Sequence, residues 1–126
     1  MFQIDIMSRI PVYEQLIRQT EKFILLGVLK EGDKLPSVRQ LSAELSINPN
    51  TIQKAFTELD RRGIIFSVNG MGNFVADKAL KALEVSRRSA FSDIKDQIKD
   101  FALAGISRTE LHEYIDEIYD EMGDKS

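Results

Sequence analysis

The chain has 126 residues, 43% of them hydrophobic, so it can bury a core and is too apolar to be a disordered tail. Its net charge of −3 at pH 7 argues against a uniformly basic nucleic-acid binder, and the lack of cysteine excludes disulfides, thiolate metal sites and cysteine nucleophiles. The sequence shows no apolar run of roughly 18 residues and no signal peptide, which predicts a cytoplasmic protein outside the membrane.

The charge is divided unevenly along the chain. Residues 1–76 carry a net charge of +1, whereas residues 77–126 carry −4. This asymmetry is compatible with a front part that meets phosphates and a back part that faces elsewhere, although +1 is weak support for DNA binding.

The first predicted helix spans residues 11–26, since Pro11 suits a first helical turn and Gly27 suits a helix end. Apolar side chains recur along it at helical spacing, which predicts an amphipathic helix. The expected buried face consists of Tyr13, Leu16, Ile17, Phe23 and Ile24. A turn over residues 30–34 follows.

A second helix is predicted from Ser37 to about Leu45, because Ser37 and Gln40 stand at the spacing of a capping box. Its expected buried stripe is Val38, Leu41 and Leu45. The next helix-start signal comes only a few residues later, where Asn48 can cap and Pro49 can occupy the first helical position. The turn between the two helices must therefore be tight.

The third predicted helix runs from Pro49 to a stop at Gly63. Its apolar positions recur at i, i+3, i+4 and i+7, and its other side chains are almost all polar. The expected buried face is Ile52, Ala55, Phe56 and Leu59.

A β-hairpin is predicted next, because residues 64–68 favour a strand, Asn69-Gly70 is a strong turn signal and residues 73–75 can return as the partner. A two-stranded hairpin is unstable alone, so it must lean on the helices. The candidate anchors are Ile64, Phe66 and Phe74.

Residues 77–104 carry apolar side chains at helical spacing, interrupted near Arg87-Arg88, and predict one long helix or two. Ser107 and Glu110 form a second capping-box pattern, which begins a last helix. Its apolar stripe is Leu111, Tyr114, Ile115, Ile118 and Met122. The predicted fold is mainly α with a small hairpin: a winged helix-turn-helix over residues 1–76 and a helical region over residues 77–126.

The exposed face of the third helix has the chemistry for reading a DNA major groove. A helix-turn-helix inserts its second helix into that groove and meets bases with its first turns. Amides can pair with adenine, hydroxyls and cations can meet phosphates, and no carboxylate lies in the first two turns to repel them. The candidate contacts on this helix are Asn50, Thr51, Gln53, Lys54 and Thr57.

Further DNA contacts are expected from the bracing helix and from the hairpin. Arg39 lies in the first turn of the bracing helix, where a guanidinium can hold a phosphate. The turn at Asn69-Gly70 lets the backbone approach the sugar-phosphate chain closely. Each feature also has a structural explanation, since Ser37 and Asn48 cap helices, Gly70 serves hairpin geometry and an arginine is commonly just solvated. The combination, in this order, favours DNA binding.

The stretch from residue 27 to residue 75 resembles the GntR family of bacterial winged-helix regulators. The matching motifs are G-V-L-K-E-G-D-K-L-P-S-V-R, N-P-N-T-I-Q-K-A-F-T-E-L, R-G-I-I and G-M-G-N-F-V, and the short tail resembles the YtrA-like subfamily. The resemblance implies a homodimeric repressor at a palindromic operator, in that subfamily often of a transporter operon. It assigns DNA contacts to Ser37, Arg39, Asn48, Asn50, Thr51, Gln53, Asn69 and Gly70.

Two positions depart from the family pattern. Many members have arginines that contact DNA where this chain has Pro49 and Gln53. Proline cannot donate a hydrogen bond, so the operator sequence of other members cannot be transferred, and the amides here are suited to A·T-containing steps.

The tail is expected to mediate dimerisation, because about 50 residues can scarcely enclose a ligand pocket and operator binding needs two recognition helices about 34 Å apart. The residues expected to face the partner are Leu80, Leu83, Phe91, Ile94 and Ile98. The alternative is that they pack on their own winged helix. The sequence does not indicate whether a small-molecule effector exists.

Three other functions are less well supported. His112 and Asp116 stand at i, i+4, a spacing that could hold a metal, but a solvated acidic face is the preferred interpretation, and no cofactor is expected. An enzyme would need a catalytic constellation or a phosphate loop, and the sequence has neither. A winged helix that binds only proteins would more often expose aliphatic or aromatic anchors than the polar face seen here.

Overall fold

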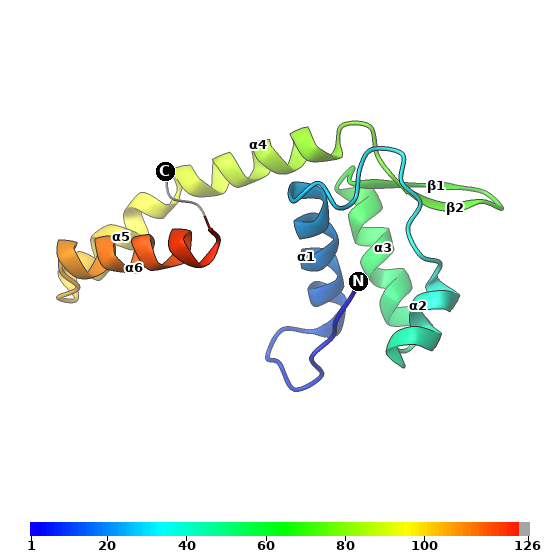
Figure 1. The fold of residues 1–126 in the computed structure, drawn as a ribbon, viewed down its shortest axis with the longest axis horizontal. Helices are drawn as coiled ribbons and strands as arrows, with labels where there is room; N and C mark the ends of the chain where they lie inside the picture. Colours follow the sequence, from blue (N-terminus) through cyan, green and yellow to red (C-terminus); the bar gives the residue numbers. More distant parts are fainter. Residues whose placement is uncertain (124–126) are drawn as a thin grey trace. The chain divides into compact units, whose positions relative to one another are not determined.

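A computed structural model describes residues 1–123, which form two compact units, one of residues 1–87 and one from residue 88 onward. The elements, labelled in Figure 1, are α1 (Val12–Leu25), α2 (Val38–Leu45), α3 (Pro49–Arg61), β1 (Ile65–Val68), β2 (Gly72–Val75), α4 (Ala79–Ser92), α5 (Ile94–Leu103) and α6 (Arg108–Glu121). The predicted fold class, mainly helical with one small hairpin, is confirmed.

The core of the first unit lies between α1, α2 and α3, and α1 and α3 run side by side (Figure 1). The apolar faces predicted for these helices supply it, although Tyr13, Phe23, Val38 and Leu45 are only partly buried at its edge. Its fully buried side chains include Leu16, Ile17, Leu41, Ile52 and Leu59. Burial of one whole face fixes the rotation of α3, so that its polar face must turn outward.

The start of α2 is a complete capping box. The backbone N–H of Gln40 donates to the Ser37 hydroxyl at 3.0 Å, and the backbone N–H of Ser37 donates to the Gln40 side-chain oxygen at 2.9 Å. These reciprocal bonds satisfy backbone donors that a helix start leaves free, as the sequence pattern predicted.

The turn between α2 and α3 is as tight as expected. Ser46 closes α2 in the left-handed conformation, with φ of 55°. Two residues later the Asn48 side-chain oxygen accepts from the backbone N–H of Asn50 at 2.8 Å, and Pro49 begins α3. Local signals alone therefore set both ends of this turn.

The hairpin forms where predicted, with Ile65 opposite Val75 and Val68 opposite Gly72. A hydrogen bond from the Met71 N–H to the Val68 carbonyl, 2.9 Å long, closes its turn, and Gly70 adopts a φ of 79° there. A side chain at this φ would be strained, so the turn needs glycine.

The expected hairpin anchors are partly wrong. Ile64 is buried, but the strand begins one residue later, and this shifts the alternation of faces. Phe66 is consequently 40% exposed, and its ring stacks on the half-buried Phe74 with centroids 5.7 Å apart. Ile65 and Val75, on the opposite face, anchor the hairpin in the core instead.

The connector between α1 and α2 lies along the outer edge of β2. The N–H of Leu35 donates to the Asn73 carbonyl, and the N–H of Gly32 donates to the Val75 carbonyl, both at 2.9 Å. Lys34 forms an isolated antiparallel bridge with Phe74. The hairpin and the segment that leads into α2 therefore share backbone hydrogen bonds and are held as one piece.

The first unit extends past the boundary expected at residue 76. Ala79 and, one turn later, Leu83 are buried in its core. Leu83, expected to face a partner chain, is only 2% exposed and is taken up by its own unit, because it shares a helix face with Ala79. Leu80, on another face of α4, is 47% exposed.

A buried carboxylate joins three helices of the first unit. Glu21 on α1 accepts a hydrogen bond from Arg62, at the end of α3, at 3.3 Å and one from Arg87 on α4 at 3.2 Å. The Glu21 side chain is almost fully buried, so its charge requires these partners.

The second unit contains the end of α4, α5 and α6. The helical pattern of residues 77–104 forms two helices, and the break lies at Asp93, after the Arg87-Arg88 interruption. Ser107 caps α6 through its hydroxyl, which accepts from the Glu110 N–H at 3.1 Å. The reciprocal arm of the predicted capping box is not seen in the described part of the chain.

None of residues 88–123 is buried. Large apolar side chains on α5 and α6 are exposed to solvent instead, among them Phe101, Tyr114, Ile115, Ile118 and Met122. Among the described residues, no helix is both long and apolar enough to cross a membrane.

Candidate nucleic-acid interface

The exposed face of α3 is polar along its whole length. Asn50, Gln53, Lys54 and Thr57 are exposed, and Thr51 is half-buried, while the opposite face lies in the core. The side chains of the predicted recognition face therefore come together on one surface, with amide, hydroxyl and ammonium groups that can meet base edges and phosphates.

Two of these side chains are oriented by neighbours. The Gln53 amide donates to the Thr57 hydroxyl at 3.3 Å, which aligns successive turns of the face. The Lys54 ammonium lies 4.2 Å from the centroid of the Tyr13 ring at the start of α1. This cation–π contact draws Lys54 toward α1 and makes Tyr13 part of the same surface.

Asn50, Gln53, Lys54 and Thr57 line one groove along α3, together with Tyr13, Glu58 and Arg62. At its far end the Glu58 carboxylate accepts hydrogen bonds from Arg61 at 2.6 Å and from Arg62 at 2.7 Å. The hydrogen bonds from Arg61 and then Arg62 lower the pKa of Glu58 from 4.5 to about 2. The same pairing raises the pKa of both guanidinium groups, so the one carboxylate lining this groove is neutralised by its arginines.

Two predicted contact residues have structural duties. Both the Ser37 hydroxyl and the Asn48 side-chain oxygen accept backbone hydrogen bonds at helix starts. The hydroxyl proton of Ser37 and the amide nitrogen of Asn48 remain available as donors. Arg39, in the first turn of α2, is exposed and forms no ion pair within residues 1–123.

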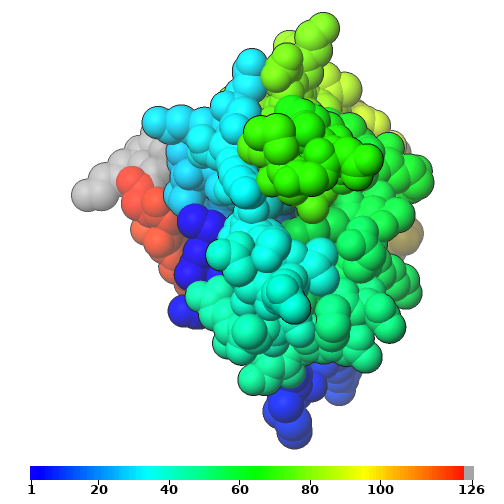
Figure 2. All heavy atoms as spheres, turned by 90° about the vertical axis from the view of Figure 1, so that its right-hand side faces the viewer, coloured from blue at the N-terminus to red at the C-terminus, as the bar shows by residue number. Residues whose placement is uncertain are grey.

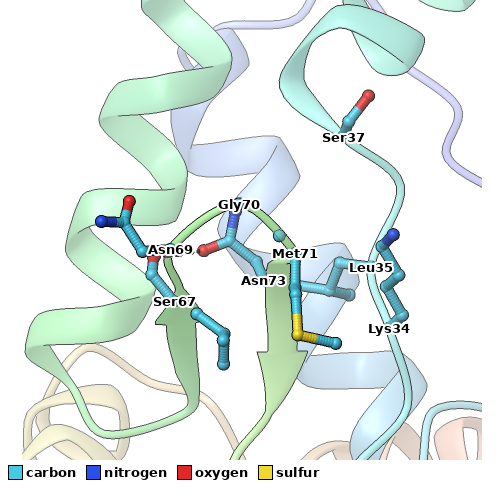
Figure 3. A pocket seen from close by; sticks show the side chains of 10 residues that line it. Lys34, Leu35, Ser37, Ser67, Asn69, Gly70, Met71 and Asn73 are labelled. Carbon is cyan, nitrogen blue, oxygen red and sulfur yellow. Dashed lines mark hydrogen bonds between the residues drawn. The ribbon is translucent and has the colours of Figure 1, made fainter.

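The hairpin turn and the start of α2 border a shallow, open hollow of about 560 Å³. Asn69 and Gly70 line it from the turn, and Ser37 lines it from the helix. Figure 3 shows these residues around the hollow, and Figure 2 shows the hairpin turn beside the segment that leads into α2 on the same face. The structure thus places the predicted wing residues Asn69 and Gly70 beside Ser37 at the start of the bracing helix, although they lie far apart in sequence.

Sequence reasoning missed two members of this surface. Tyr13 was assigned only to the buried face of α1, and Lys34 was treated as part of a turn. Lys34 lines the hollow, and Tyr13 lines the groove on α3. Their positions depend on packing between elements, which the sequence does not show. Lys34 could still have been suspected as a DNA contact, because it lies only three residues before the Ser37 cap.

No group of three or more histidine, cysteine, aspartate or glutamate side chains that could hold a metal ion occurs within residues 1–123.

Residues 12–75 match the family model described as bacterial regulatory proteins, gntR family. The matched segment runs from the start of α1 to the end of β2 and contains both helices of the helix-turn-helix and the hairpin. The chain belongs to the GntR family. This GntR protein is a transcriptional regulator of the YtrA type with a DNA-binding winged helix, in agreement with the expected class.

The relatives of this regulator extend the match beyond the winged helix. It is 42% identical over 119 residues to the HTH-type transcriptional repressor YtrA of Bacillus subtilis (strain 168), covering 94% of this chain and 92% of that relative. A transcriptional antiterminator from Listeria monocytogenes EGD-e is similar in structure, with a TM-score of 0.72, 34% identity and coverage of 94% of this chain and 89% of the other.

A third similar structure includes DNA. The AraR DNA-binding domain, solved in complex with operator ORX1, matches with a TM-score of 0.53 and 29% identity over 59% of this chain and 92% of that one. The match therefore relates the fold of this GntR regulator to that of a protein seen on its operator.

Proposed function

We propose that the protein is a homodimeric repressor that binds a palindromic operator through α3, the start of α2 and the hairpin. One observation carries the proposal: candidate contact residues of α3, of the hairpin and of the start of α2 line neighbouring hollows, and the polar face of α3 is held outward by a fully buried opposite face. A third hollow joins the other two, because it is lined by Gln53 and Thr57 of α3 and by Ser67 and Asn73 of the hairpin. The proposed DNA contacts are Ser37, Arg39, Asn48, Asn50, Thr51, Gln53, Lys54, Thr57, Asn69 and Gly70.

The contacts divide between base reading and backbone anchoring. Asn50 and Gln53 carry amides on the exposed first turns of α3, where they can pair with adenine edges in the major groove. Arg39 and the hairpin turn hold the sugar-phosphate backbone and set the register of the helix. Since α3 begins with Pro49, which has no N–H, base reading starts at Asn50.

The proposed dimer uses the second unit together with exposed residues of α4. Leu80, Phe91 and Ile94 are exposed and Ile98 is half-buried, and a soluble chain rarely leaves so many apolar side chains on the surface without a partner. A second copy would cover them and would supply the second recognition helix that a palindromic site requires.

Repression follows in this proposal from the occupied operator, which would block transcription of the operon downstream. The similarity to a protein named as a repressor supports this direction of control. The resemblance to the YtrA-like subfamily extends the proposal to an operon that encodes a transporter. A regulator of this kind acts in the cytoplasm, where the chromosome lies.

DNase footprinting of the purified full chain on the DNA upstream of its own gene tests the proposal. We expect one protected site with roughly twofold symmetry, whose half-sites lie about one helical turn apart. If the chain binds this fragment no more tightly than random DNA, sequence-specific repression is contradicted. That result would favour the alternative function, a winged helix that binds other proteins.

Two single variants test the division of labour on that site. Arg39→Ala is expected to weaken binding to operator and random DNA alike, whereas Asn50→Ala is expected to cost about 1–3 kcal/mol on the operator and little on random DNA. Titration by fluorescence anisotropy on both duplexes measures the two losses. An equal loss on both duplexes for Asn50→Ala would refute its role in base reading.

A further inference from the structure

Lys34 lies in the connector that leads from α1 past the hairpin to the start of α2. Its backbone bridges Phe74 on β2, and the neighbouring Leu35 N–H donates to the Asn73 carbonyl at 2.9 Å. Three residues later the Ser37 cap begins α2. The backbone of Lys34 is therefore fixed between the two elements that border the hollow, and this limits where its side chain can reach.

The side chain of Lys34 crosses the hairpin at Gly72. A β-carbon built on Gly72 would lie 3.1 Å from the Lys34 Cε, closer than side chains normally approach, and Gly72 also has a φ of 117°. Glycine at this position therefore leaves the space that the lysine uses. Figure 3 shows Lys34 beside the hairpin and Met71 at the hollow.

The hollow has the chemistry of an anion site. Lys34 is the one charged residue that lines it, and its other polar lining residues are Ser37, Ser67, Asn69 and Asn73. No aspartate or glutamate lines it, and Lys34 forms no ion pair within residues 1–123. The Ser67 hydroxyl donates to the Asn73 side-chain oxygen at 2.7 Å, but the side-chain amides of Asn69 and Asn73 and the Ser37 hydroxyl can still donate. An exposed ammonium on a hollow that is also lined by such donors, without a counter-charge, is suited to a phosphate group.

We propose that Lys34 binds a phosphate of the DNA backbone in the hollow between the hairpin turn and the start of α2. The inference rests on the proposed DNA-binding function and deepens it. Lys34 would hold the DNA strand whose sugar-phosphate backbone passes between the hairpin and the bracing helix. This contact would contribute affinity without sequence preference.

The test compares Lys34→Gln, Lys34→Arg and the wild-type chain on two probes, the upstream DNA fragment and a mixed-sequence duplex of roughly 30 base pairs, which spans two half-sites. Binding is titrated at several salt concentrations. Lys34→Gln is expected to weaken binding to both probes about tenfold and to reduce the slope of log affinity against log salt by about 0.9 for each protomer. Lys34→Arg is expected to keep the wild-type slope, because it keeps the charge.

Lys30→Gln is the matched control, because Lys30 belongs to the same connector but lines a different hollow, beside Ile24 and Ala76. It is expected to bind like the wild type. An unchanged affinity and slope for Lys34→Gln, or an equal loss for Lys34→Arg, would overturn the phosphate contact. Failure of the wild type itself to bind either probe would instead remove the proposed function, so the two failures are distinguishable.

Discussion

The two units of this protein use similar apolar residues in opposite ways. In residues 1–87 most leucines and isoleucines of α1, α2 and α3 are buried, and charged groups such as Glu21 have partners. In residues 88–123 helices of similar length leave most of their large apolar side chains exposed, Ile98 and Leu111 are half-buried, and none is buried.

Helical periodicity in a sequence therefore predicts an apolar face, but it does not indicate what covers that face. Most of the stability of a helix in a protein comes from packing of its apolar face. The helices α5 and α6 therefore gain little stability from packing within their own chain. The first unit has a core of its own and is expected to fold by itself, whereas the second is expected to depend on a partner surface.

The strongest destabilisation is expected from a substitution inside the first unit. Leu83→Ala is expected to lower the free energy of unfolding by about 2–5 kcal/mol, because it removes a buried side chain and leaves a cavity. Val85→Ala, two positions later on α4 and 58% exposed, is expected to change it by less than about 0.5 kcal/mol. Urea unfolding of both variants at one fixed protein concentration provides the comparison, and equal losses would contradict the assignment of Leu83 to the core.

A smaller effect is expected on the assembly of the second unit. Ile118→Asp places a charge on the exposed apolar face of α6 and is expected to weaken self-association by about 1–3 kcal/mol, or roughly 5- to 150-fold in the dissociation constant. Sedimentation velocity across a dilution series measures the shift from dimer to monomer. Glu117→Gln, the neighbouring exposed position, is the control, and an Ile118→Asp chain that dimerises like the wild type would argue against this face as the interface.

The smallest expected effect concerns the charge cluster at the end of α3. Because hydrogen bonds from Arg61 and Arg62 hold the pKa of Glu58 near 2, below its ordinary value of 4.5, the carboxylate stabilises the fold above pH 4.5 and loses this contribution as the pH falls toward 2. Wild type and Glu58→Gln should therefore differ in unfolding free energy at pH 6 and converge between pH 4.5 and pH 2. A difference that stays constant over this range would show that the ion pairs contribute nothing.

The sequence predicted those features that depend on local chemistry. The caps at Ser37 and Asn48, the polar face of α3 and the turn at Gly70 all follow from residues within a few positions of one another. These signals were enough to locate the helix-turn-helix and the hairpin, and with them most of the candidate interface.

The features that sequence reasoning placed wrongly or missed depend on contacts between distant elements. Phe66 was given the wrong face because the strand begins at Ile65, and Leu83 was given to a partner because nothing local shows that α4 returns to the core. Lys34 and Tyr13 join the interface through the hairpin and through Lys54, respectively. Periodicity along one segment carries no information about such contacts.

The carboxylate of Glu21 has a practical consequence for anyone who recombines GntR regulators. It holds together α1, the end of α3 through Arg62 and the middle of α4 through Arg87. A chimera joined directly after the hairpin would discard Arg87 together with the tail and leave a buried charge with one partner fewer, while a junction beyond Arg87 would transfer the three residues as a set. The portable DNA-binding module therefore ends inside α4, about two and a half turns into that helix and 12 residues past the segment that the family model matches.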